Sequence, residues 1–162
     1  MNQLAWQQAV RRAYGRHSVL VARLECAFAS SSSVTKKVVE LWREAGIVLR
    51  PGDEREGIKL KIQRDPDLFL VAEDDQQILG VVLGAWDGRR GLINHLAVRE
   101  GYKRSRMGRS LVRELERRLI GKGALKVNAQ IYKSNGVSLE FFKSLNYEVQ
   151  SDLIMVGRNL KH

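Results

Sequence analysis

The stretch from Leu92 to Leu119 constrains the fold more than any other part of the sequence. It contains an apolar strand pattern that ends at Val98, then a short basic loop, then an amphipathic helix pattern. Unpaired backbone N–H groups and the positive end of the helix dipole make such a junction a suitable seat for phosphate. The cationic side chains around it are Lys103, Arg104, Arg106 and Arg109. We therefore expect a polyanionic ligand to bind here.

Composition limits the class of protein. A chain of 162 residues with 44% hydrophobic and 28% charged residues is expected to form one globular domain. Its net charge of +10 favours an anionic partner, such as a nucleotide-like cofactor, nucleic acid or an acidic protein surface. The alternative is that most of this charge only solubilises the surface. The single cysteine, Cys26, excludes an internal disulfide framework and a cysteine-based zinc site, and we expect no metal. Without a long apolar run we expect no membrane span and a cytoplasmic protein.

The order of the remaining patterns predicts an α+β fold around one sheet. Helical spacing of apolar residues is found over 2–14, 34–45, 51–65, 107–119 and 134–145. Strand patterns are found over 17–24, 68–72, 78–83, 91–98, 125–132, 147–149 and 153–156. This order predicts a central mixed, mostly antiparallel sheet with helices on both faces. We expect residues 1–30 to form an N-terminal extension, with a short helix and a first strand, and residues 31–162 to form the main domain.

Several short motifs, in this order and at this spacing, resemble a known family. They are Leu49–Asp53, Asp67–Glu73, Leu96–Val98 with the basic loop after it, Asn135–Phe142 and Leu145–Tyr147. From about Val34 to Leu160 the chain resembles the GNAT N-acetyltransferase superfamily, especially its YpeA-like and ribosomal-protein-acetyltransferase-like branch. The resemblance implies a GNAT-like fold whose sheet is splayed at the middle strands, and acetyl-CoA bound in the resulting gap.

The resemblance also implies which residues bind acetyl-CoA. The strand over Asn94–Val98 would contain a bulge, and the backbone of Leu96, Ala97 and Val98 would pair with the pantetheine amides. Asn135 and Phe142 would contact the pantetheine arm. The pyrophosphate would be held by the loop and the first helical residues: Lys103, Arg104, Ser105, Arg106, Met107, Gly108 and Arg109.

The implied reaction is direct attack of an unprotonated amine on the thioester. Strand alternation predicts that Asn94 and Leu96 face one side of the sheet and that His95 faces the other, as an ordinary core or surface histidine. The resemblance implies that the side of Asn94 and Leu96 is the acceptor side. Asn94 is the candidate for holding a water that relays the amine proton, unless it is only a solvated polar residue. Tyr147, or water, is the candidate acid that protonates the departing thiolate. Asn135 has an equally simple alternative role as a helix N-cap.

Two positions depart from the family's pattern. Arg106 stands where the loop usually has glycine, and would cost roughly 1–2 kcal/mol if that position needs a positive φ. Phe142 stands where many relatives have a tyrosine that protonates the thiolate. A catalytically silent acyl-CoA-binding domain therefore stays an alternative to an enzyme. A basic nucleic-acid-binding module is another, although aromatic residues are only 7% and do not alternate with the basic clusters.

The acceptor is expected to be a small-molecule or peptide amine, and its identity is not contained in any motif of the sequence. A homodimer through the terminal strands or the N-terminal helix is an arrangement that these elements allow.

Overall fold

The computed structural model describes residues 20–23, 32–74 and 77–160. It divides into two compact units, Met1–Ala129 and Gln130–His162, which are described separately. The helix predicted over 2–14 lies outside the described residues.

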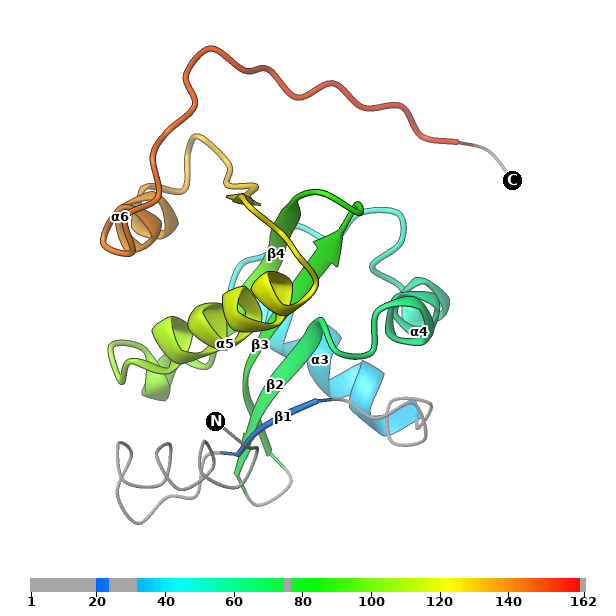
Figure 1. Cartoon of the computed structure of the whole chain (residues 1–162). Helices are drawn as coiled ribbons and strands as arrows, with labels where there is room; N and C mark the ends of the chain where they lie inside the picture. Colours follow the sequence, from blue (N-terminus) through cyan, green and yellow to red (C-terminus); the bar gives the residue numbers. More distant parts are fainter. Residues whose placement is uncertain (1–19, 24–31, 75–76, 161–162) are drawn as a thin grey trace. The chain divides into compact units, whose positions relative to one another are not determined.

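A five-stranded sheet in the first unit has the strand order β1-β2-β3-β4-β5 (Figure 1). The strands are β1 (Leu20–Arg23), β2 (Phe69–Asp74), β3 (Gln77–Trp86), β4 (Gly91–Val98) and β5 (Val127–Ala129). Strands β1 to β4 pair antiparallel in succession, and β5 pairs parallel to β4. The prediction of a mixed, mostly antiparallel sheet is confirmed.

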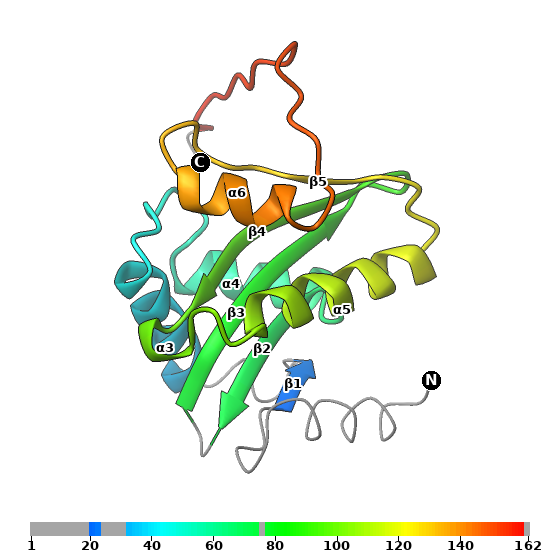
Figure 2. The same ribbon diagram turned by 90° about the vertical axis from the view of Figure 1, so that its left-hand side faces the viewer.

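Helices α3 (Ser32–Glu44) and α4 (Arg55–Arg64) cover one face of this sheet (Figure 2). Their apolar residues and those of the facing strands form one buried cluster, in which Trp42 and Val81 are fully buried. The helices predicted over 34–45 and 51–65 therefore exist, and the second begins after Pro51-Gly52-Asp53, as its turn residues indicate.

Helix α5 (Met107–Gly121) covers the opposite face and approaches the strands closely because the strands offer glycines there (Figure 2). A Cβ atom at Gly84 would lie 2.5 Å from Leu115 Cδ1, and one at Gly91 would lie 2.6 Å from Leu119 Cδ1. Leu115 and Leu119 are fully buried, so these contacts fix how α5 sits on the sheet. Helices on both faces were predicted, and this is confirmed.

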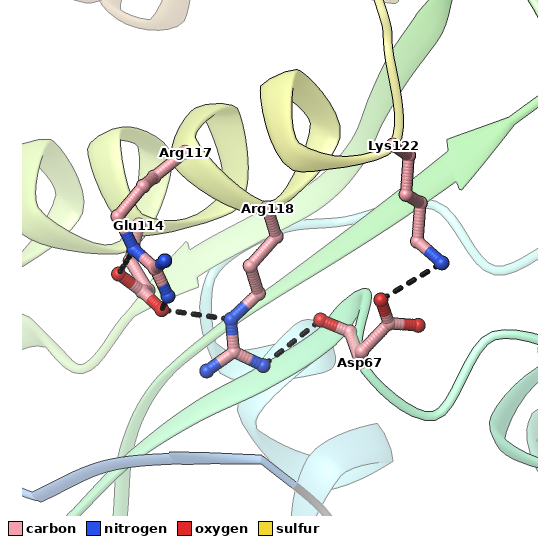
Figure 3. A network of polar contacts seen from close by, with 5 residues as sticks. All are labelled: Asp67, Glu114, Arg117, Arg118 and Lys122. Carbon is pink, nitrogen blue, oxygen red and sulfur yellow. Dashed lines mark hydrogen bonds and ion pairs between the residues drawn. The ribbon is translucent and has the colours of Figure 1, made fainter. Parts of the chain in front are cut away.

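A polar network fastens α5 to the segment just before β2 (Figure 3). The Glu114 side chain is only 3% exposed and accepts hydrogen bonds from Arg117 and Arg118 at 2.7–2.8 Å. Arg118 also donates to the Asp67 carbonyl at 2.9 Å, and Lys122 pairs with the Asp67 carboxylate at 2.9 Å. Burial by itself raises the pKa of Glu114, but the bonds from the two arginines outweigh it and the net pKa is lowered.

The second unit contains helix α6 (Gly136–Lys143), within the range predicted for it. Three strand predictions need correction. The strand predicted over 125–132 is confined to β5, and residues 147–149 and 153–156 form no strand. Their alternating apolar residues give a segment that fits a sheet, but a strand also requires a partner edge, and the described part of this unit contains none. Ile154 and Val156 are accordingly 89% exposed.

Candidate functional site

A bulge interrupts β4 near its carboxyl end. In the pairing with β3, Ala97 lies opposite Val81 and Asn94 lies opposite Leu83, so two residues of β4 face one residue of β3. His95, one of the two, has a φ of 48°. An inserted residue with positive φ is a known form of β-bulge, and it bends the strand and redirects its side chains. The bulge expected at this place is present.

Beyond the bulge, β4 has strand pairing on one side only. Strand β5 pairs with Gly91, Leu92 and Ile93, and the pairing with β4 stops at Ile93. Within the described residues, Asn94–Val98 pairs with β3 alone. The backbone of Leu96, Ala97 and Val98 therefore borders an open strand edge, which can accept an extended amide-containing ligand as a further strand partner.

The loop after β4 reaches α5 through two residues in the left-handed backbone region. A single 3₁₀ turn, η1 (Glu100–Tyr102), is followed by Arg104 with φ 66° and Arg106 with φ 67° and ψ −1°. Between them, the Ser105 hydroxyl donates to the Tyr102 carbonyl at 2.5 Å. Arg106 is the N-cap of α5 and makes no side-chain capping bond. The positive φ considered for this position is therefore present, with arginine where glycine is the least strained residue.

The start of α5 offers hydrogen-bond donors and positive charge together. Within the described part of the chain, the backbone N–H groups of Arg106, Met107 and Gly108 donate to no protein acceptor, as expected for a helix without a side-chain cap. The side chains of Arg104 and Arg106 are exposed and pair with no carboxylate of the described residues. Met107 is 1% exposed and anchors the turn against Gly80. Lys103, by contrast, is bound to Glu100, so part of its charge is neutralised. The arrangement suits a phosphate-bearing ligand.

Arg99 fixes the end of β4 to the neighbouring elements. Its guanidinium binds Glu44 of α3 at 2.8 Å and the Ile78 carbonyl of β3 at 3.3 Å. A hollow of about 370 Å³ lies beside this contact. Its lining residues are Glu44, Ala45, Val98, Arg99, Glu100 and Lys103. Arg99 therefore supports the strand end from which the basic loop departs.

His95 does not face away from Asn94, and the prediction that it does is wrong. Asn94 lies opposite Leu83, which packs on the cluster beneath α3. His95 faces the same helices, because its Nε2 lies 3.1 Å from Asp53 Oδ2 and its ring centroid lies 4.7 Å from that of Trp42. The bulge breaks the two-residue alternation on which the prediction depended. For the same reason, the spacing of Asn94 and Leu96 no longer places them on one face. Asn94 faces the α3 cluster, and the next residue of β4 that belongs to this cluster is Ala97, not Leu96.

Sequence reasoning missed the Asp53–His95 pair altogether. The two residues are 42 positions apart, and in the sequence Asp53 is notable only as the end of the Leu49–Asp53 motif. Side-chain exposures are 22% for His95 and 12% for Asp53, so the pair is partly buried. The only local indication was the irregular strand pattern at His95.

The second unit contains the other predicted site residues. Asn135 caps α6: its Oδ1 accepts the Ser138 N–H at 3.0 Å. Phe142 is 5% exposed, and its ring meets that of Tyr147 edge-on at 5.1 Å between centroids. The N-cap role considered for Asn135 is thus present, and Phe142 and Tyr147 pack on each other.

Two other kinds of feature are absent from the described residues. No group of three or more His, Cys, Asp or Glu side chains in this part of the chain is arranged to hold a metal ion. No helix in the same part is long and apolar enough to cross a membrane.

The sequence has clear relatives. The acetyltransferase (GNAT) family profile matches residues 35–147. An acetyltransferase of Sodalis glossinidius is 33% identical over 126 residues, which is 77% of this chain and 88% of the relative. An acetyltransferase of Yersinia pestis is 36% identical over the same shares of the two chains.

Solved structures share the fold at lower identity. A PaiA N-acetyltransferase from Thermoplasma acidophilum in complex with coenzyme A matches with a TM-score of 0.70 at 19% identity, over 82% of this chain and 91% of that one. An aminoglycoside acetyltransferase from an uncultured soil metagenomic sample, in complex with sisomicin, matches with a TM-score of 0.65 at 19% identity, over 88% and 97%. The fold of this chain is the fold of these acetyltransferases. The chain belongs to the GNAT acetyltransferase family.

Proposed function

We propose that this protein is an N-acetyltransferase that moves the acetyl group of acetyl-CoA to a primary amine by direct attack. Within the family we assign it to the YpeA-like and ribosomal-protein-acetyltransferase-like branch, on the motifs quoted above. One observation supports the proposal most directly. The open edge of β4 is followed, after the loop 99–106, by a helix start whose first N–H groups and two arginines have no partner among the described residues.

The residues present fit acetyl-CoA. The backbone of Leu96, Ala97 and Val98 offers donors and acceptors to the two pantetheine amides along the open edge. The N–H groups of Arg106, Met107 and Gly108, which donate to no acceptor of the described residues, would bind the pyrophosphate. The remaining loop residues of the proposed site, which add charge or shape, are Lys103, Arg104, Ser105 and Arg109. Acetyl-CoA supplies the activated acetyl group, and no metal is required for this transfer.

The protein's own contribution is to position the amine and to handle its proton. Asn94, on the α3 face beside the bulge, is proposed to hold a water that relays this proton. Tyr147 is proposed as the acid for the thiolate, and Asn135 and Phe142 as contacts of the pantetheine arm. These last three roles depend on the resemblance alone, since their residues lie in the second unit.

The acceptor is proposed to be a small-molecule or peptide amine. Among proteins with this fold, one was solved with sisomicin and another, the NatC complex, with a Gag peptide and CoA. A panel of spermidine, kanamycin, a peptide with a free N-terminus and a lysine peptide covers both classes. A homodimer is proposed as well, and light scattering at the assay concentration tests it.

Two measurements test the function. Thermal shift and calorimetry with acetyl-CoA and CoA test binding; 100 times the dissociation constant should stabilise the protein by about 2.7 kcal/mol. Release of free CoA thiol with each amine of the panel tests transfer. Arg104→Gln should weaken CoA binding, whereas the matched Arg89→Gln, an exposed arginine in the β3–β4 turn, should not.

The outcomes separate the alternatives. Binding with transfer supports the enzyme. CoA binding without transfer to any amine favours the silent acyl-CoA binder, for which Phe142 in place of tyrosine is the specific argument. A response to nucleic acid and none to CoA would refute the proposal.

A further inference from the structure

We infer that His95, held by Asp53, is the base that takes the proton from the acceptor ammonium. This inference deepens the proposed function and depends on it. It begins with position: the bulge turns His95 toward the α3 face, at the point where the open edge of β4 begins. A ligand extended along Leu96–Val98 would therefore have the imidazole at its end.

The hydrogen bonding of the pair fixes which ring nitrogen can act. Asp53 Oδ2 already accepts the Arg50 backbone N–H at 2.8 Å and lies 3.1 Å from His95 Nε2. A carboxylate only accepts, so Nε2 holds the hydrogen and the lone pair is on Nδ1. No described residue occupies Nδ1 with a hydrogen bond, and the side chain is 22% exposed. The basic nitrogen is thus available to a substrate.

The ring is also held in place. The fully buried Trp42 packs against it with 51° between the ring planes, and Trp42 Nε1 itself has no hydrogen-bond partner within the described residues. A ring fixed by an aromatic wall on one side and a carboxylate at Nε2 meets the requirements of an oriented base.

Few other charges surround this pair. Glu44 of α3 is paired with Arg99 at 2.8 Å, and Arg50 and Glu54 in the adjoining loop are exposed. Strand β3 contains no titratable side chain from Gln77 to Trp86. Among the residues that the structure describes, Asp53 is therefore the one carboxylate in contact with the imidazole, and it can stabilise the imidazolium that forms.

The proton balance is closed. His95 Nδ1 takes one proton from the ammonium, and the neutral amine attacks the thioester carbonyl. The new C–N bond forms, the C–S bond breaks, and the thiolate receives the second amine proton. His95 then releases its proton to solvent, so one proton leaves for each acetyl group transferred.

The test uses the full chain and the variants His95→Asn and Asp53→Asn. Asparagine tolerates positive φ, so His95→Asn keeps the bulge but cannot take the proton. Glu44→Gln is the matched control, because it removes another contact between α3 and β4 without a role in proton transfer. CoA affinity by calorimetry and kcat/KM from pH 5.5 to 9.5, for the best amine of the panel, are measured for each.

For His95→Asn we expect unchanged CoA affinity and a loss of about 10²-fold in kcat/KM at pH 7. The deficit should shrink as the pH approaches the pKa of the acceptor amine, because the amine then loses its proton to solvent. Asp53→Asn should lose less, about tenfold, and Glu44→Gln should keep the wild-type profile. His95→Gln provides a second variant if His95→Asn fails to fold.

Three results would overturn the inference. A His95 variant with a profile parallel to wild type and a rate within threefold would show that the pair only fastens the 50–53 loop to β4. Equal losses in the Glu44 control would mean that the effect is structural. Failure of the wild type to bind CoA, or to acetylate any amine, would instead remove the proposed function on which the inference depends.

Discussion

The left-handed backbone of Arg106 predicts that a glycine variant is more stable than an alanine variant at this position, the reverse of an ordinary helix position. At φ 67° the Cβ of any non-glycine residue is strained, by roughly 1–2 kcal/mol. Arg106→Gly and Arg106→Ala both remove the cation, so the difference between them isolates the backbone term. Glycine removes this strain but gains about 0.5–1 kcal/mol of unfolded-state freedom relative to alanine. The glycine variant should therefore be more stable than the alanine variant, by up to about 1.5 kcal/mol.

Thermal or urea unfolding measures this difference. For a chain of this length, 1 kcal/mol corresponds to about 2–4 °C in melting temperature. The matched control is Arg113, an exposed residue inside α5 with ordinary helical backbone. At that position the glycine variant should be less stable than the alanine variant by about 1 kcal/mol, which is the opposite of the order expected at Arg106.

CoA binding gives the second half of this prediction. Because both Arg106 variants lose the same guanidinium, both should weaken CoA binding, by about three- to tenfold at low salt, and less at high salt. If Arg106→Gly is no more stable than Arg106→Ala, the left-handed backbone is not strained and the reasoning fails. If only the alanine variant weakens binding, the arginine does not contact phosphate.

Three further predictions concern stability. Glu114→Gln should lower the free energy of unfolding by about 1.5–3 kcal/mol, since it removes a buried charged acceptor. Because the folded-state pKa of Glu114 is lowered, its contribution is complete above its unfolded pKa and is lost as the pH falls through the folded-state pKa. Urea titrations of wild type and variant should therefore converge in acid. Gly84→Ala should cost about 1–3 kcal/mol because its Cβ meets the buried Leu115, whereas Gly101→Ala, with nothing within 4 Å, should be neutral in the same melts. Asn135→Ala should lose about 1 kcal/mol as a missing N-cap, while Asn135→Ser keeps the cap; weaker CoA binding by the serine variant would support a ligand role, and unchanged binding would refute it.

The sequence predicted the helices and strands that depend on local residue patterns. Apolar periodicity located α3, α4 and α5 to within a few residues, and the strand pattern over 91–98 has the bounds of β4. The loop between β4 and α5 was also predictable, including the strain at Arg106, because its backbone follows from one strand, one helix and the residues between them.

What could not be predicted depends on pairing between distant segments. The segment 153–156 has the alternation of a strand, but whether it becomes one depends on an edge that alternation does not describe. The Asp53–His95 contact likewise joins residues 42 positions apart. Strand alternation even predicted the wrong face for His95, because it assumes a regular strand on both sides of the residue.

The bulge in β4 explains why the errors and the site occur at the same place. One extra residue between Asn94 and Ala97 redirects His95 toward α3, and the pairing of β4 with β5 stops at Ile93, just before this point. A regular strand would pair along its whole length and keep His95 on the α5 face, with neither an open edge nor a base beside it. Replacing the bulge by a regular strand, through deletion of His95, should therefore remove CoA binding and transfer together. The point substitution His95→Asn should remove transfer alone.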